Sequence, residues 1–504
     1  MESRTYRLLD FLRVKEHLGG LALSIPGEKA CRDLEPYQDP IGLHRETELL
    51  HQALDCTREI QNSLVPFPEL EGLFALLDAG RVIEEDGFWA LQVVLQQALQ
   101  VNKALTALDP IRNPRLVSFF AEHAWPEKTM QGVNRCLSPD GVIKDESSPE
   151  LLRIRQELRR IQTQCTKKID AYLFQGNQIQ YLQDNYLTIS SDRYVLAVKT
   201  NFKGKIQGIV HDYSQTGETC YVEPLSLVEL NNRLQEIKQE ERQARYRVLT
   251  YLSSLFGQER EAVRSTYLRL VELDVLQAKL AMAREFEGRD LQPGGAEVRL
   301  IKARHPLLYW DSTDTRPLDI EFNPEQQGLI ISGGNSGGKT VALKTLGLIG
   351  LMALSALPVP VEEGSSLPFW KEIHPFFGDE QSLDENLSTF TAQIEHLRSA
   401  WPGLGPESLV LLDEFGAGTD PSQGAALAQA VLDHLLEKGV WFMAATHFPA
   451  LKAYGLGNPK VRAASVLFDP RTKHPLYTIA YDQVGQSQAL DVAREQGLPG
   501  EVIK

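Results

Sequence analysis

Residues 328–340 read GLIISGGNSGGKT, a short apolar stretch followed by a glycine-rich loop and a Lys-Thr pair. The apolar residues predict a buried strand, and helical spacing follows Thr340, so the loop joins a strand to a helix. Glycines there let backbone N–H groups turn toward phosphate oxygens, and the helix N-terminus adds positive potential. Lys339 can reach the β- and γ-phosphates, and the Thr340 hydroxyl can bind Mg²⁺. The predicted nucleotide-binding residues are Gly333, Gly334, Asn335, Ser336, Gly337, Gly338, Lys339 and Thr340.

A second apolar run, residues 409–412, ends in the acidic pair Asp413-Glu414. A nucleotide site at the edge of a sheet needs carboxylates at the end of a buried strand. We expect Asp413 to hold Mg²⁺ together with Thr340, and Glu414 to orient or deprotonate the attacking water. The alternative, an exposed acidic pair after a strand, becomes less favourable beside a phosphate loop. Glu414 and Lys339, together with His447, which follows the next apolar run, are therefore the predicted catalytic residues of an ATP-hydrolysing enzyme.

The next apolar run, residues 440–446, is followed by His447. We expect this histidine to sense the γ-phosphate, although a lone histidine after a strand is often structural. Phosphate loop, acidic pair and histidine after successive strands occur in both RecA-like and ABC-type ATPases. Two segments favour the ABC type: the glycine-rich residues 415–421, suited to close backbone approach, and residues 386–390, which precede a helix whose N-terminal hydroxyls can face an anion.

The flanking sequence predicts a multidomain protein with an α/β domain at residues 291–504, where short apolar runs alternate with helices. Residues 1–130 have helical periodicity throughout and predict a helical core domain. Residues 131–290 predict long helices, the first of them capped by Ser148 and Pro149, that flank a β-rich insertion at about 178–222. This organisation resembles a lever that carries a small β-rich head.

The composition excludes several classes of protein. Five cysteines without a CxxC pair indicate neither a zinc site nor a disulfide framework, and no apolar run reaches the length of a membrane span. We therefore expect a cytoplasmic protein without a membrane partner. The net charge of −15 means that any nucleic-acid contact must be local. The most compact basic cluster lies in the β-rich insertion and comprises Arg193, Lys199, Lys203 and Lys205, although lysines that protect an edge strand explain it equally well.

Four ordered segments resemble the ATPases of MutS-type proteins, and among them a bacterial branch, MutS-two. They are GGNSGGKTVALKTLGLIGLMA at 333–353, GDEQSLDENLSTF at 378–390, LVLLDEFGAGTDPSQGAALA at 409–428 and ATHFPALKAYG at 445–455. Weaker stretches extend the resemblance over essentially the whole chain.

The resemblance implies an ABC-type fold that binds ATP or ADP with Mg²⁺ and hydrolyses ATP as a homodimer. By the same resemblance, Gln381 binds nucleotide, Ser388 and Thr389 reach the partner subunit's nucleotide, Asp420 lies in the loop that crosses the dimer, and His447 is the switch histidine. Family members clamp around DNA, branched or non-specific. The branch is linked to suppression of homologous recombination and to the rescue of collided ribosomes.

The chain also departs from the family pattern. It opens on helical sequence rather than a mismatch-reading domain, and it stops before the C-terminal nuclease domain of the branch, so we predict neither mismatch recognition nor nuclease activity. Gly334 stands where the family usually has proline, which adds backbone freedom to the loop. Two alternatives stay open: a nucleotide-gated scaffold that hydrolyses little ATP, and a ribosome-splitting factor for which DNA is irrelevant.

Overall fold

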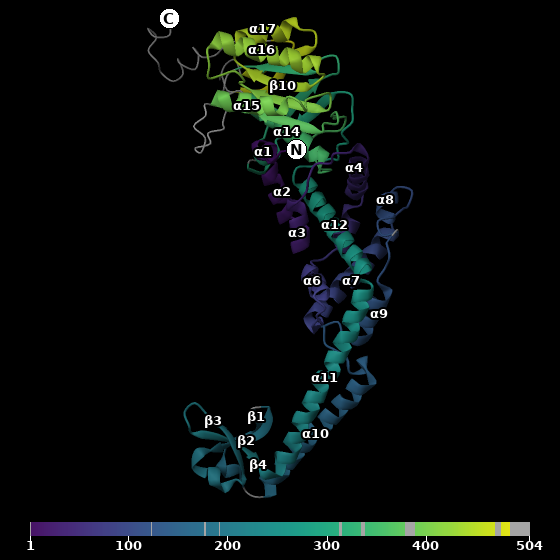
Figure 1. Ribbon diagram of the computed structural model, residues 1–504, viewed down its shortest axis with the longest axis vertical. Helices are drawn as coiled ribbons and strands as arrows, with labels where there is room; N and C mark the ends of the chain where they lie inside the picture. Colours follow the sequence, from purple (N-terminus) through teal and green to yellow (C-terminus); the bar gives the residue numbers. More distant parts are fainter. Residues whose placement is uncertain are drawn as a thin grey trace. The chain divides into compact units, whose positions relative to one another are not determined.

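The computed structural model describes residues 2–121, 123–175, 178–190, 192–311, 315–333, 338–377, 389–468 and 475–483 (Figure 1). The chain forms two compact units that interleave along the sequence. Unit 1 comprises residues 1–66, 99–122 and 269–504, and unit 2 comprises residues 67–98 and 123–268. The predicted domains are contiguous instead, with boundaries near 130 and 290, and those boundaries stay predictions.

Unit 1 contains a six-stranded sheet of order β12-β11-β7-β10-β9-β8, in which only β12 is antiparallel to its neighbour. Each parallel strand is a short, continuous apolar run because helices cover both faces of the sheet. The predicted alternation of strands and helices is confirmed as a mixed α/β fold. The elements in chain order are β7 (Gly328–Ser332), α14 (Lys339–Leu354), β8 (Glu372–Phe376), α15 (Thr389–Ala400), β9 (Ser408–Asp413), α16 (Pro421–Glu437), β10 (Trp441–Thr446), α17 (Pro449–Gly457), β11 (Val461–Phe468) and β12 (Pro475–Tyr481).

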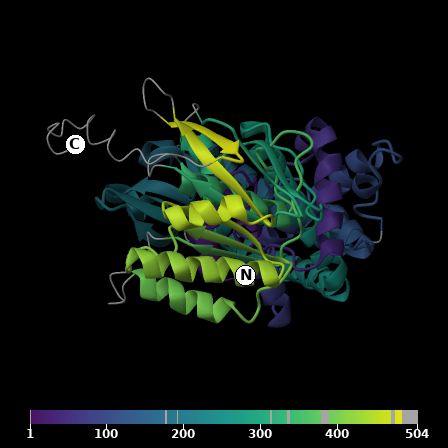
Figure 2. The same ribbon diagram turned by 90° about the horizontal axis from the view of Figure 1, so that it is seen from above.

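Successive residues of these strands point to opposite faces, so the sheet has two separate cores. Leu329, Leu411 and Met443 pack with α14 in one cluster. Ile330 and Phe442 belong to the other cluster, which includes side chains of α15, α16 and α17. The helices that follow α14 are coloured green to yellow in the view from above (Figure 2). The result is a three-layered arrangement that holds the start of α14 at the edge of the sheet.

The N-terminal helices of the chain complete the first of these cores. Leu9 is fully buried in the same cluster as α14. A Cβ on Gly347 would lie 2.6 Å from Leu411 and 2.7 Å from Leu9, so this glycine allows α14 to fit between β9 and the N-terminal segment. Asp10 also forms an ion pair with Lys344 of α14 at 3.0 Å. Residues at opposite ends of the sequence therefore share one core.

The other elements of unit 1 are mostly helical, with a small antiparallel sheet of two strands. They are α1 (Ser3–Leu8), α2 (Phe11–Gly20), α3 (Ile25–Arg32), α4 (Pro40–Asp55), α5 (Thr57–Ser63), α8 (Pro114–Val117), β5 (Val298–Ala303), α13 (Pro306–Asp311) and β6 (Leu318–Phe322). Two long helices, α7 (Glu85–Thr106) and α12 (Arg260–Glu285), contribute residues to both units.

Unit 2 contains an antiparallel sheet of order β1-β2-β4-β3 between two long helices, α10 and α11. This sheet lies within and just beyond the β-rich segment predicted at 178–222. Its elements are α6 (Glu71–Asp78), α9 (Glu127–Cys136), η1 (Asp145–Ser147), α10 (Pro149–Gln175), η2 (Gln178–Tyr181), β1 (Leu182–Ser190), β2 (Arg193–Lys199), η3 (Thr200–Lys205), β3 (Gly208–Tyr213), β4 (Thr219–Pro224), η4 (Leu225–Leu227) and α11 (Val228–Gln258).

Two predictions about the long helices have different outcomes. The Ser148 hydroxyl accepts a hydrogen bond from the Leu151 N–H at 3.1 Å, which confirms the predicted cap at the start of α10. The helical stretch predicted after the β-rich insertion is not one helix, because α11 ends at Gln258 and α12 begins at Arg260. At the break, the Glu259 carboxylate accepts hydrogen bonds from the N–H and the hydroxyl of Thr129.

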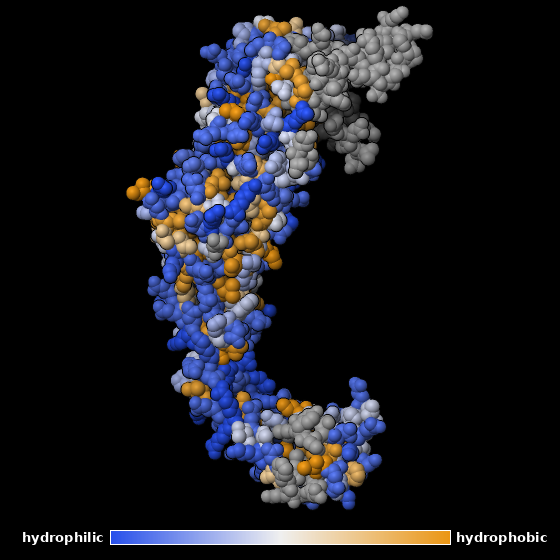
Figure 3. Space-filling model, turned by 180° about the vertical axis from the view of Figure 1, so that it is seen from behind, coloured by the Kyte–Doolittle hydropathy of each residue, from blue (hydrophilic) through white to orange (hydrophobic). Residues whose placement is uncertain are grey.

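No helix in the described part of the chain combines sufficient length with sufficient apolar character to cross a bilayer. On the face drawn in Figure 3, hydrophilic side chains predominate and hydrophobic ones form smaller areas between them.

Candidate nucleotide site

The candidate site lies where three neighbouring parallel strands end. β10 pairs with β7 on one side, where Thr446 is opposite Ser332, and with β9 on the other, where Ala445 is opposite Asp413. Because these strands are parallel and in register, the residues that follow them meet at one edge of the sheet. Gly333 and Lys339 on either side of the phosphate loop, the acidic pair and His447 therefore lie at this edge, after the strands that the sequence predicts.

Thr340 and Asp413 are in direct contact. The Thr340 hydroxyl donates a hydrogen bond to Asp413 Oδ2 at 2.5 Å, although the two residues are 73 positions apart in the sequence. Asp413 is 9% exposed, and Thr340 is the second residue of the largely buried helix α14. A hydroxyl and a carboxylate at this distance form a hard-oxygen pair, which is the donor type that Mg²⁺ prefers.

Lys339 is buried at the same edge, with 3% of its surface exposed. Its Nζ donates a hydrogen bond to the Gly333 carbonyl at 2.8 Å, so the side chain points toward the residue that follows β7. Burial lowers the pKa of the Lys339 amine, and the Glu414 and Asp413 carboxylates oppose that shift. A partly desolvated ammonium beside two carboxylates is well placed to bind the phosphate of a metal–nucleotide complex.

Glu414 and His447 lie together at the mouth of the site. His447 Nδ1 is 3.7 Å from Glu414 Oε1, and the two side chains are about half and one third exposed. Glu414 has a φ of 49°, in the left-handed region that non-glycine residues rarely adopt. Its N–H donates to the Ala445 carbonyl at 3.0 Å, which ties this conformation to β10. Backbone strain of this kind concentrates at functional sites.

The glycine-rich loop after Glu414 is a tight turn that leads into α16. Gly416 and Gly418 have φ values of 89° and 90°, and a Cβ on Gly416 would lie 2.7 Å from the Gly424 carbonyl oxygen. The predicted need for glycine in this loop is therefore steric. Asp420 caps α16, because its Oδ1 accepts hydrogen bonds from the N–H groups of Ser422 and Gln423 at 3.1 and 3.0 Å. Its assignment to a dimer-crossing loop stays a prediction.

Several predicted residues lie outside the described residues. They are Gly334, Asn335, Ser336 and Gly337 of the phosphate loop, together with Gln381 and Ser388. Thr389 is the first residue of α15. Their assignments to nucleotide binding and to the partner subunit's site stay predictions.

One cation near the site is not selected by the sequence analysis. Lys452 on α17 lies close enough to Lys339 for its charge to lower the pKa of the Lys339 amine further. Its sequence signal is weak, because a lysine inside ATHFPALKAYG is also expected on the solvated face of a helix. Only the placement of α17 after β10 brings it to this edge.

The predicted basic cluster in unit 2 is not uniform. Arg193 Nη1 pairs with the fully buried Glu223 at 2.8 Å, and its Nη2 donates to Asn232 at 2.8 Å. This arginine therefore has a structural role inside the sheet, which leaves it less suited to bind phosphate than the sequence suggests. Lys199, Lys203 and Lys205 are exposed.

Comparison with known proteins agrees with this geometry. Residues 329–504 match the family model described as MutS domain V. Over its whole length the chain is 52% identical to a protein of Solidesulfovibrio magneticus and 50% identical to one of Maridesulfovibrio salexigens, both named Endonuclease MutS2. A protein of Aquifex aeolicus with the same name is 35% identical. The chain belongs to the MutS2 branch of the MutS family.

The family resemblance predicted from the sequence is thus confirmed. The chain spans 65% of the length of the first of these MutS2 proteins and 66% of the other two. The match to MutS domain V begins at Leu329 in β7, so it includes every residue that forms the candidate nucleotide site.

Proposed function

We propose that this chain is an ATPase of the MutS2 branch, which binds ATP with Mg²⁺ at the edge of the six-stranded sheet and hydrolyses it in an ABC-type homodimer. The observation that carries the proposal is the contact between Thr340 and Asp413, because it brings the phosphate-loop threonine to the carboxylate at the end of β9. Nuclease activity, despite the name of the relatives, is not part of the proposal.

The side chains fit the chemistry of a magnesium–nucleotide complex. When bound, Mg²⁺ would neutralise phosphate charge between the β- and γ-phosphates. Thr340 and Asp413 would hold it, because their oxygens already lie 2.5 Å apart. Lys339 would exchange its bond to the Gly333 carbonyl for a phosphate oxygen. Glu414 would orient the attacking water or accept its proton, and His447, 3.7 Å away, would position that carboxylate.

Nucleic-acid binding and dimerisation complete the proposed function. The exposed lysines Lys199, Lys203 and Lys205 would contact phosphates without reading sequence. Ser388 and Thr389 would complete the partner subunit's nucleotide site, as would the loop that Asp420 ends. Suppression of recombination and rescue of collided ribosomes are the two cellular roles that the branch suggests, with DNA and ribosomes as the respective partners.

Two substitutions of Thr340 test the role of its contact with Asp413. Thr340→Val keeps the shape of the side chain but removes the hydroxyl, whereas Thr340→Ser keeps the hydroxyl. We expect the valine variant to lose about 1.5 to 3 kcal/mol of stabilisation, hence about ten- to hundredfold in phosphate release. The serine variant should stay close to wild type. Equal rates for both variants would overturn the role of Thr340.

Phosphate release by the wild-type chain tests the scaffold alternative. We expect the steady-state rate to be well above that of Lys339→Ala. If the wild-type chain binds ATP but releases phosphate no faster than Lys339→Ala, the scaffold alternative is favoured over hydrolysis.

A mixture of two inactive variants tests the dimer. Lys339→Ala and Ser388→Ala subunits should together regain activity, because one of the two composite sites keeps both intact residues. No regain of activity would contradict a shared site.

A further inference from the structure

Helix α10 of unit 2 has an apolar, buried face and an exposed face that carries positively charged side chains. The buried side chains repeat at spacings of three, four or seven residues, which places them on one stripe toward α11. They are Leu151, Ile154, Ile161, Cys165 and Ile169.

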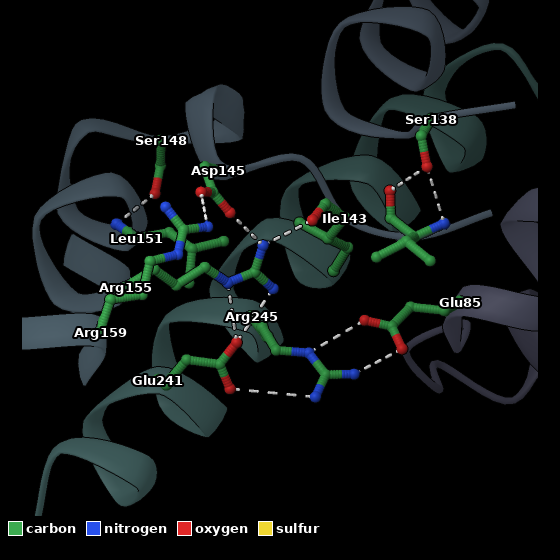
Figure 4. Close-up of polar contacts among 11 residues, drawn as sticks. Glu85, Ser138, Ile143, Asp145, Ser148, Leu151, Arg155, Arg159, Glu241 and Arg245 are labelled. Atoms are coloured by element: carbon green, nitrogen blue, oxygen red, sulfur yellow. Dashed lines mark hydrogen bonds and ion pairs between the residues drawn. The ribbon is translucent and has the colours of Figure 1, made fainter. Parts of the chain in front are cut away.

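The arginines at the edge of this stripe are neutralised. Arg155 donates to Asp145 at 2.8 Å and to Glu241 of α11 at 3.0 Å, and Arg159 also pairs with Asp145 (Figure 4). Arg155 points between the two helices with only 16% of its side chain exposed, and its pairing with Asp145 holds the pKa of that carboxyl below its ordinary value. Arg155 therefore links α10 to α11, and both arginines link α10 to η1.

The opposite face carries a stripe of three cations, which we call the α10 stripe: Arg153, Arg160 and Lys167. All three are exposed, and in the described part of the chain no hydrogen bond or ion pair involves their charged groups. Seven-residue spacing keeps them in line and separates neighbours by about 10 Å along the helix. Gln156 and Glu157 lie between Arg153 and Arg160, and Thr163 and Gln164 lie between Arg160 and Lys167.

Two of the three acidic residues of α10, Glu150 and Glu157, form ion pairs with arginines of α11. Glu150 pairs with Arg247 at 2.8 Å, and Glu157 pairs with Arg233 at 2.9 Å. Asp170 is exposed beyond the last cation of the stripe. The stripe therefore keeps its positive charge on a chain whose net charge is −15.

We propose that the α10 stripe is a second nucleic-acid contact, outside the β-rich insertion, and that its partner is the phosphate backbone of duplex DNA. A straight row of cations about 20 Å long fits a rigid, regularly charged partner, and a DNA duplex stays straight over far greater lengths. Single strands are bound by aromatic stacking platforms, and the exposed face between Arg153 and Lys167 has no aromatic residue. The inference rests on the proposed nucleic-acid binding and is independent of the nucleotide site.

The test compares two triple variants of the whole chain with the same net charge. One is Arg153→Gln, Arg160→Gln and Lys167→Gln, and the other changes three exposed arginines elsewhere, Arg58, Arg81 and Arg112, to glutamine. Binding of a labelled DNA duplex is measured by fluorescence anisotropy over a range of salt concentrations. We expect the stripe variant to bind at least tenfold more weakly at about 0.1 M salt. Its log-log salt slope should be shallower by about 2.7, the value for three phosphate contacts.

Further variants and ligands separate the outcomes. Arg153→Lys with Arg160→Lys keeps the charge and should bind like wild type. If both glutamine variants bind DNA equally well, the inference about the α10 stripe is wrong. The proposed function still stands in that case, provided that the wild-type chain binds DNA and releases phosphate. Duplex RNA that is bound with the same dependence on the stripe, at equal or higher affinity, overturns the assignment to DNA. If substitution of Lys199, Lys203 and Lys205 by glutamine makes the salt dependence of DNA binding shallower and substitution of the α10 stripe does not, the stripe is not a DNA contact.

Discussion

The nucleotide site and the α10–α11 region of unit 2 use charged side chains in different ways. In the site, a few charges from separate strands and helices meet at one sheet edge, and Lys339 and Asp413 are buried there. In unit 2, arginines and carboxylates are numerous and pair across adjacent helices and strands, as Arg155 and Glu241 do. A lost charge should therefore alter chemistry in the first region and stability in the second.

The largest expected effect is at the site. Glu414→Gln removes the group that would accept a proton from water, so phosphate release should fall by about 10²- to 10⁴-fold. The melting temperature should hardly change, because the side chain is one third exposed and its backbone bond to Ala445 remains. Glu437→Gln, at the exposed end of α16, is the charge-matched control. An unaltered rate in Glu414→Gln removes this residue from the mechanism.

Unit 1 also contains a buried histidine, His305, that should affect stability and not chemistry. Burial lowers the pKa of His305 from 6.5 to about 4, with Asp10 opposing and Lys344 and Arg13 adding to the shift. The unfolded chain therefore binds a proton first as the pH falls. Stability is complete above pH 6.5 and is lost toward pH 4, by up to about 3 kcal/mol.

Urea unfolding of wild type and His305→Gln at a series of pH values measures this effect. The variant should lose less stability than wild type between pH 6.5 and 4. Parallel pH profiles for the two proteins would mean that His305 is not the group that titrates.

In the sheet of unit 2, a single buried carboxylate should matter for stability and not for hydrolysis. Burial raises the pKa of Glu223, but hydrogen bonds from Asn231, His211 and Arg193 outweigh it and keep the carboxyl ionised. Glu223→Gln leaves Arg193 without its charge partner and should lower the free energy of unfolding by about 2 kcal/mol. Glu218→Gln, exposed in the turn between β3 and β4, is the control. A fall in phosphate release that exceeds the fall in the amount of folded protein would contradict a purely structural role for Glu223.

The smallest expected effect is at the cap of α16. Asp420→Ala removes the acceptor for the first N–H groups of the helix and should lower stability by about 1 kcal/mol, while Asp420→Asn should retain most of it. Thermal melting checks both. A loss of phosphate release in Asp420→Asn, where the fold is kept, would support the predicted role of this residue in the dimer. Stability equal to wild type in Asp420→Ala would contradict the capping role.

Residues at the ends of strands were the most predictable part of the molecule. Lys339, Thr340 and Asp413 meet because parallel strands in register bring the residues at their carboxyl ends to one edge, and the apolar runs that mark these strands are visible in the sequence. The left-handed conformation of Glu414 was not predictable, since it depends on the hydrogen bond to Ala445 of a neighbouring strand.

Long-range charge pairing was the least predictable part. Arg193 looks like a phosphate-binding residue in the sequence, and only the folded sheet brings it to Glu223. The break at Glu259 is not visible in the sequence, because both helices around it have continuous helical periodicity, and the carboxylate at the break bonds to Thr129, far away in the sequence. Periodicity reports the face of a helix and not its tertiary partners.

The packing of Leu9 and Asp10 on α14 has a practical consequence for dissecting the protein. A fragment cut near residue 290 would retain the whole six-stranded sheet, yet it would lack the N-terminal helices that bury Gly347 and pair with Lys344. Such a fragment would expose an apolar groove along the helix that begins at the phosphate loop, and it should aggregate or lose nucleotide affinity. A functional fragment that contains the six-stranded sheet would need both the N-terminal helices and the C-terminal part of the chain, joined by a linker or expressed together.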